Sequence, residues 1–167
     1  MELLRAVALI LATMSMGLMA GVFGLYAHTV MPGLRRTDDR TFVGAFQAMD
    51  RAIINPWFMV GGFMGALVFT LAAAALHVGV APVLPWTLAA LGLYVVVVAI
   101  TFRVNLPRNN VIKAAGDPDG IADLAAVRQR FDEAVWSRWN LIRTVLSTVA
   151  FACLAWALVE SGAAAIS

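Results

Sequence analysis

The chain has 167 residues, of which 62% are hydrophobic and 13% charged, with a formal net charge of +2. Soluble domains carry roughly 45–50% apolar and about 25% charged residues, so this chain has more apolar surface than a core of its size can bury. The composition excludes an ordinary soluble domain, a disordered chain and a nucleic-acid-binding protein, and it indicates a lipid environment.

Four continuous apolar runs predict four transmembrane helices. They cover residues 3–31, 56–77, 85–102 and 141–158. Each run is long enough to cross about 30 Å of hydrocarbon, and unbroken apolar character favours helices over strands. The first run is too long for a signal peptide, so we interpret it as a retained span. We therefore predict an all-α fold, a four-transmembrane-helix bundle that forms a single integral membrane domain over residues 1–167.

The loop between the first two spans contains a predicted amphipathic helix. Its apolar residues recur at helical spacing and are Phe42, Phe46, Met49 and Ile53. Asp38 or Asp39 is a suitable N-cap. The segment should end before Asn55-Pro56, since proline disfavours helix in the residue before it.

The segment before the fourth span also reads as helical. Asp117 is a suitable N-cap, with Pro118 at the first helical position. The apolar stripe that follows consists of Ile121, Leu124, Val127, Phe131 and Val135. Because no glycine or proline lies between Pro118 and Gly162 except Gly120, beside the start, we predict one long helix that runs into span four. The two segments outside the membrane should pack together as a cap on the bundle.

Positive charge predicts the orientation of the spans. Arginine and lysine are concentrated in the loop after span one and in the loop between spans three and four, whereas residues 78–84 carry no charge. Positive loops stay in the cytoplasm. We therefore predict a multi-pass protein of the inner (plasma) membrane, with loops one and three cytoplasmic and both termini outside.

Two pairs of small residues suit close helix packing. Gly17 with Gly21, and Gly61 with Gly65, have the spacing that lets membrane helices approach closely. We predict that they join spans one and two within the monomer. A homo-oligomer formed through these glycine faces is the alternative.

Polar residues are costly in lipid and therefore informative. Those that gather at the predicted cytoplasmic ends of the spans, with nearby aromatic residues, are Tyr26, His28, Asn55, Asn105, Asn109, Asn110, Trp136, Trp139, Asn140 and Arg143. Trp136, Asn140 and Arg143 share one helix face, at spacings of four and three. This convergence predicts a binding or active site.

Each of these residues also has a purely structural interpretation. Tryptophans at a membrane boundary are commonly interfacial anchors, and Arg143 is long enough to snorkel to the headgroups. Asn109 follows Pro107 and suits a turn, whereas Tyr26 and His28 suit a helix end at the boundary.

Metal ligands are scarce in this chain. His28 and His77 should lie on opposite sides of the membrane, about 30 Å apart, so they cannot share a haem or a metal ion. The single cysteine, Cys153, excludes an internal disulfide and a cysteine-based metal cluster. We predict no cofactor. A metal ion held by His28 with aspartates of loop one is kept as an alternative.

Four stretches carry a resemblance to a known family. They are Met31-Pro-Gly-Leu34, Phe46-Gln-Ala-Met49 with Ile54-Asn-Pro56, Asn105-Leu-Pro-Arg-Asn109, and Trp139-Asn140 followed by Arg143. In this order they resemble the DUF1772, or anthrone oxygenase-like, family of small four-span proteins, over nearly the whole chain. The resemblance implies oxygenation of polyketide anthrones to anthraquinones without a prosthetic group. The positions that match the family motifs are Asn105, Asn109, Trp139, Asn140 and Arg143; His28 matches none.

The resemblance and the polar cluster together suggest a membrane-embedded oxygenase that acts on a lipophilic phenolic small molecule. His28 would be the catalytic base, since its ordinary pKa lies near neutrality, and Arg143 would stabilise the developing enolate. The substrate-binding candidates are Tyr26, Asn55, Asn105, Asn109, Trp136, Trp139 and Asn140. The alternative is a non-enzymatic membrane protein that binds a lipid, a quinone or a partner protein through the same cluster.

Overall fold

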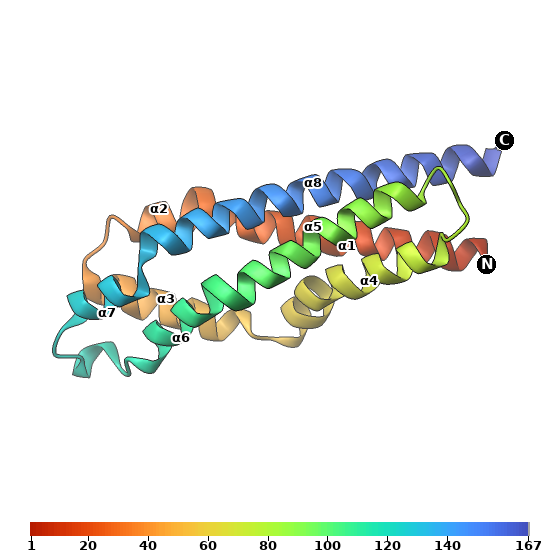
Figure 1. Ribbon diagram of the computed structural model, residues 1–167. Coiled ribbons are helices and arrows are strands. Elements are labelled where there is room, and N and C mark those ends of the chain that lie inside the picture. The colour runs from red at the N-terminus through yellow and green to blue at the C-terminus, as the bar shows by residue number, and fades with distance from the viewer. Residues whose placement is uncertain (167) are drawn as a thin grey trace.

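The computed structural model describes residues 1–166, and this part of the chain is helical with no strands (Figure 1). The elements are α1 (Glu2–Leu25), η1 (Tyr26–Val30), α2 (Met31–Leu34), α3 (Asp39–Ile53), η2 (Trp57–Phe63), α4 (Met64–Leu76), α5 (Leu84–Ile100), η3 (Thr101–Asn105), α6 (Leu106–Ala114), η4 (Pro118–Gly120), α7 (Leu124–Phe131) and α8 (Glu133–Ile166). The elements η1, η2 and η3 are π-helical turns, and η4 is a 3₁₀ turn.

Four helical stretches in the described residues are long and apolar enough to cross a membrane. They cover Glu2–Leu34, Trp57–Leu76, Leu84–Ala114 and Leu124–Ala163. The predicted all-α, four-span bundle is therefore confirmed, and the chain is a multi-pass membrane protein. The third stretch continues well beyond residue 102 through η3 and α6, with Pro107 in the first turn of α6. Asn109 is thus helical, and its interpretation as a turn residue is wrong.

Helix α1 packs against both α4 and α8, and α5 completes the bundle. The contact with α4 is close: Ser15 Oγ donates a hydrogen bond to the Gly61 carbonyl over 2.8 Å. A Cβ at Gly65 would lie 2.3 Å from the Val60 carbonyl oxygen, so only glycine fits beside this π-helical turn. The predicted approach of spans one and two is confirmed at Gly61 and Gly65, whereas Gly17 faces Phe151 of α8.

Helices α3, α6 and α7 form a cap at one end of the bundle, and the two termini lie at the other end (Figure 1). We call the end with α3, α6 and α7 the capped end. Helix α3 begins as predicted, with the Asp38 carboxylate accepting the Thr41 N–H over 2.9 Å. The rings of Phe42 and Phe131 lie 5.6 Å apart and join α3 to α7. Loops one and three therefore pack together, as expected; their cytoplasmic location stays a prediction from charge.

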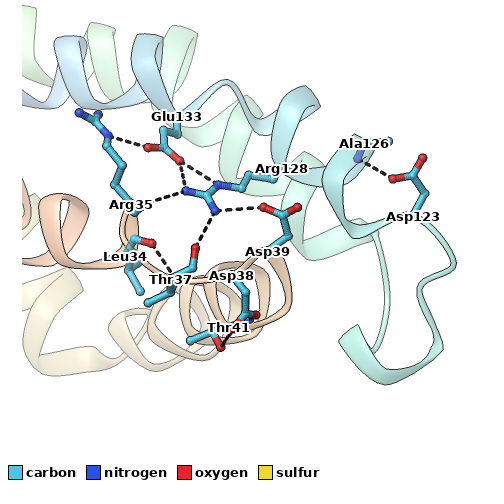
Figure 2. A network of polar contacts seen from close by, with 10 residues as sticks. All are labelled: Leu34, Arg35, Thr37, Asp38, Asp39, Thr41, Asp123, Ala126, Arg128 and Glu133. Carbon is cyan, nitrogen blue, oxygen red and sulfur yellow. Dashed lines mark hydrogen bonds and ion pairs between the residues drawn. The ribbon is translucent and has the colours of Figure 1, made fainter.

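Arg128 ties the cap together. Its guanidinium donates to Asp39 Oδ1 at 3.0 Å and to Glu133 Oε2 at 2.9 Å, and it also donates to the Thr37 carbonyl at 3.1 Å. Figure 2 shows these contacts, together with the second ion pair that Arg35 forms with Glu133. One cation thus joins the start of α3 to α7 and to the start of α8.

The prediction of one long helix from Pro118 into span four is wrong. Asp117 and Pro118 begin only the short turn η4, and α7 starts separately, with the Asp123 side chain accepting the Ala126 N–H. The chain breaks again at Asp132, which has a left-handed backbone with φ 55°. Aspartate tolerates this conformation better than most residues because its short side chain bonds locally, here to the Val135 N–H at 3.3 Å.

Candidate functional site: a cavity beneath the cap

A cavity of about 190 Å³ lies where the cap meets the membrane spans. Helices from both regions surround it: α1, η1, α3, η2, η3, α6 and α8 all contribute side chains. Its walls are mostly apolar and aromatic. The polar or hydrogen-bonding side chains that line it are Tyr26, Asp50, Thr101, Asn109, Trp136, Asn140 and Arg143. An apolar pocket with a few convergent polar groups is the usual form of a small-molecule site.

The three π-helical turns converge on this cavity. Each belongs to a different span, and each contributes at least one lining residue: Tyr26 from η1, Phe58 from η2 and Thr101 from η3. A π-helical turn inserts one residue into a helix and is frequently found at functional sites. Three such turns at one level therefore mark this part of the bundle as the candidate site.

Arg143 is the most unusual group in the cavity wall. It is 5% exposed, with Nη1 donating to Thr101 Oγ1 at 3.0 Å and Nη2 donating to Asn140 Oδ1 at 2.8 Å. Its guanidinium carbon lies 4.4 Å from the centre of the Phe23 ring. The alternative, purely structural interpretation, in which this arginine snorkels to the headgroups, is wrong.

The charge of Arg143 has no counterion among the side chains that the structure describes. Its Nε is also buried without a hydrogen-bond partner. A buried charge is costly unless it is paired. The neutral acceptors Thr101 and Asn140 orient the guanidinium without neutralising it, so the cavity presents a positive charge that an anion would stabilise.

A second set of polar side chains, linked by hydrogen bonds, lies in the wall formed by α3, α6 and α8. The Trp136 indole N–H donates to Asn109 Oδ1 at 2.7 Å, and Asn109 Nδ2 donates to Asp50 Oδ1 at 2.6 Å. Lys113 Nζ lies 2.9 Å from Asp50 Oδ2. The cavity therefore contains a carboxylate as well as a guanidinium.

Asp50 is one of the loop-one aspartates that were expected only as possible metal ligands beside His28, and its position in the cavity was not predicted. The position of Asp50 in the sequence could have indicated its burial. It lies four residues after Phe46, on the apolar face of α3 that packs into the cap. A charged residue on a buried helix face needs partners. Asn109 and Lys113 of α6 supply them.

Five of the predicted site residues line the cavity: Tyr26, Asn109, Trp136, Asn140 and Arg143. Three others lie outside it. Asn105 is buried and donates to the Trp136 carbonyl at 3.2 Å, so it supports the wall from behind. Asn55 caps the start of the second span, accepting the Phe58 N–H at 2.9 Å. Trp139 is partly exposed on α8, as an interfacial anchor would be.

His28 does not lie in the cluster, so its predicted placement there is wrong. It is exposed, and Nδ1 of its ring is 2.6 Å from the hydroxyl of Thr29. The physical reason is helix geometry: residues two apart do not share a face, and Tyr26 is the residue that faces the cavity. Among the described residues, no group of three His, Cys, Asp or Glu side chains is placed to hold a metal ion.

The cavity opens sideways. Of the lining residues, Ile54 and Phe102 have large exposed fractions, 58% and 54%. Ile54 connects α3 to η2, and Phe102 belongs to η3. The aromatic cluster of Phe42, Phe46 and Phe131 fills the cap itself. The opening therefore lies on the flank of the bundle rather than through the cap.

The fold is that of a multi-pass membrane protein, and its cavity is mostly apolar with a few polar side chains in the wall. A family model described as anthrone oxygenase matches residues 55–153, and the chain belongs to this family. No curated protein and no solved structure matches the chain. The matched stretch includes Asn109, Trp136, Asn140 and Arg143, whereas Asp50 lies just before it.

Proposed function

We propose that this protein oxygenates a lipophilic phenolic molecule of the anthrone type, bound in the cavity, without a prosthetic group. The observation that carries the proposal is the buried, unpaired guanidinium of Arg143 in a cavity with aromatic walls. Such a site suits a flat molecule that becomes an anion during the reaction. The family description names the same reaction class.

An anthrone carries a methylene group whose deprotonation places negative charge on the ring carbonyl oxygen. The resulting carbanion reacts with oxygen, and the overall change converts the methylene group and O₂ into a second carbonyl group and water. Arg143 binds the carbonyl oxygen as its charge develops. The rings of Phe23, Tyr26 and Trp136 pack against the substrate.

The size and position of the cavity support this substrate class. Its volume of about 190 Å³ exceeds the roughly 150 Å³ of an engineered apolar cavity that takes up benzene. A larger ring system extends through the opening between Ile54 and Phe102. Because the flank of the bundle faces lipid, a molecule that partitions into the bilayer reaches the opening directly.

The test is turnover of emodin anthrone by the purified protein in lipid nanodiscs, followed by oxygen consumption and anthraquinone absorbance. We expect Arg143→Met to reduce the rate about 100-fold or more, as removal of one oxyanion donor does in other enzymes. The matched control is Arg138→Met, which removes an exposed arginine from the same helix. Activity should persist in the presence of a metal chelator. A wild-type rate equal to the protein-free rate would refute the proposal.

A non-enzymatic role is the second candidate, and the same unpaired Arg143 favours it. A quinone or the headgroup of an anionic lipid would also neutralise this guanidinium. Native mass spectrometry of the protein released from mild detergent distinguishes the two candidates. A retained quinone or lipid that Arg143→Met abolishes, together with no turnover of anthrone, would support the binding role.

A further inference from the structure

We propose that Asp50 is the catalytic base, the group that removes the proton from the substrate methylene. This inference rests on the proposed oxygenase function and adds the residue that the chemistry requires. Among the described residues that line the cavity, Asp50 is the only carboxylate, and no histidine lines it. Asp50 is 7% exposed, so its carboxylate acts in a largely dry environment.

A hydrogen bond from Asn109 and an ion pair with Lys113 fix the direction of the Asp50 carboxylate. Trp136 donates to the oxygen of the Asn109 amide, which leaves the amide N–H group to donate to Asp50 Oδ1 at 2.6 Å. Lys113 approaches the other oxygen at 2.9 Å. Each carboxylate oxygen has two acceptor positions. Oδ2 has almost no accessible surface and accepts no hydrogen bond, so we assign proton acceptance to the second position on Oδ1.

The ion pair with Lys113 also connects the cavity to the surface. The side chain of Lys113 is 24% exposed, whereas that of Asp50 is 7% exposed. The other cation of the site, Arg143, binds the carbonyl oxygen of the substrate on which negative charge develops. Lys113 therefore pairs with the proposed base, and Arg143 pairs with the substrate anion.

The proposed reaction balances in two proton transfers. In the first, a C–H bond of the methylene breaks, its electron pair delocalises onto the ring carbonyl, and the proton bonds to an Asp50 oxygen. The carbanion then passes one electron to O₂, and the radical pair forms a C–O bond. Asp50 returns its proton to the peroxide oxygen, giving a hydroperoxide.

In the second transfer, Asp50 removes the remaining hydrogen of the same carbon as a proton. The electron pair of that C–H bond forms the new carbonyl, and the O–O bond breaks to release hydroxide. Hydroxide takes the proton from Asp50 and leaves as water. The carbon is oxidised from methylene to carbonyl, one O₂ is reduced, and Asp50 returns to its starting state.

Proton removal can be measured without oxygen. We would incubate emodin anthrone anaerobically with the protein in D₂O and follow deuterium entry at the methylene by mass spectrometry. We expect Asp50→Asn to reduce the protein-dependent exchange rate about 100-fold or more, in line with the usual contribution of a general base. Asp50→Glu should restore part of the rate. Anthrone binding, followed by tryptophan quenching, should stay within about fivefold of wild type.

Two control variants separate catalysis from a structural role. Asp39→Asn removes a carboxylate of the same helix that pairs with Arg128 outside the cavity, so exchange should match wild type. Lys113→Met breaks the ion pair of Asp50 but keeps its carboxylate, so exchange should stay within about tenfold of wild type. An equal loss in Lys113→Met and Asp50→Asn would show that the ion pair only joins α3 to α6, and would overturn the proposal.

The outcomes also distinguish this inference from the function on which it rests. If wild-type protein oxygenates anthrone and Asp50→Asn exchanges deuterium at the wild-type rate, Asp50 is not the base and the oxygenase function stands. If wild-type protein accelerates neither exchange nor oxygenation, the proposed function fails, and the role of Asp50 fails with it.

Discussion

The indole N–H of Trp136 donates a hydrogen bond to the side-chain oxygen of Asn109 over 2.7 Å. This contact joins α8 to α6 at the edge of the cavity, and it determines which end of the Asn109 amide faces Asp50. Trp136, which could be interpreted from the sequence as an anchor at the membrane boundary, is instead a buried side chain that is 3% exposed.

Replacing Trp136 by phenylalanine keeps an aromatic ring but removes this hydrogen bond. Asn109 Oδ1 then loses its donor inside the protein, so we expect a loss of about 1–3 kcal/mol in unfolding free energy. The Asn109 amide also becomes free to rotate, and turnover of anthrone should fall with little change in substrate binding. Unfolding in detergent, followed by circular dichroism, measures the first effect. A variant as stable as wild type would contradict the assigned hydrogen bond.

Asn140 and Arg143 should be strongly coupled. Asn140 accepts from Arg143 Nη2 at 2.8 Å and donates to the Phe23 carbonyl at 3.0 Å. Asn140→Leu leaves the buried guanidinium with Thr101 as its remaining partner, and we expect destabilisation of about 2–3 kcal/mol. The double variant Asn140→Leu with Arg143→Met removes the stranded charge and should recover most of that loss. A double-mutant cycle on detergent unfolding checks this. Additive effects would show that the two side chains act independently.

Asp38, the N-cap residue of α3, should make the stability of the helices at the capped end depend on pH. The backbone N–H and the hydroxyl of Thr41 bond to the Asp38 carboxylate and hold its pKa below the ordinary value. A group with a lowered pKa in the folded state stabilises the fold above its unfolded pKa, and the stabilisation is lost as the pH falls through the folded pKa. Asp38→Ala should therefore lower the melting temperature at pH 7 and have little effect near pH 2. An equal effect at both pH values would contradict this role.

The membrane spans and the amphipathic helix α3 were predictable because each is indicated by many residues at once. The residues of a span all face lipid or the bundle interior, and the buried apolar residues of α3 pack into the cap. Lipid selects apolar side chains along an entire span, and the buried stripe of α3 repeats over its length, with Phe42 and Phe46 at its centre. An error at one position leaves such a pattern intact. The break at Asp132, by contrast, depends on the backbone conformation of one residue that is neither glycine nor proline.

The direction of single side chains near the cavity was harder to predict for a similar reason. A π-helical turn inserts a residue and rotates everything after it relative to a regular helix, and no residue pattern marks η1 in advance. Regular spacing shows that Tyr26 and His28 do not share a face, but only the structure shows that Tyr26 is the one that faces the cavity. Helix α8 contains no π-helical turn, so regular helical spacing was enough to predict that Trp136, Asn140 and Arg143 share one face. This prediction is confirmed.

The last prediction concerns entry from the membrane. Phe102 lines the cavity while 54% exposed, and its ring packs edge-on against that of Phe63, with 6.4 Å between the ring centres. Phe102→Trp should narrow the opening and raise the KM for anthrone several-fold, with a smaller change in kcat, because the chemistry lies deeper, at Arg143. The control is Val95→Trp, which adds the same bulk at an exposed site of α5 that does not line the cavity. If both variants shift KM equally, the effect arises from the bilayer surface, and the substrate does not enter beside Phe102.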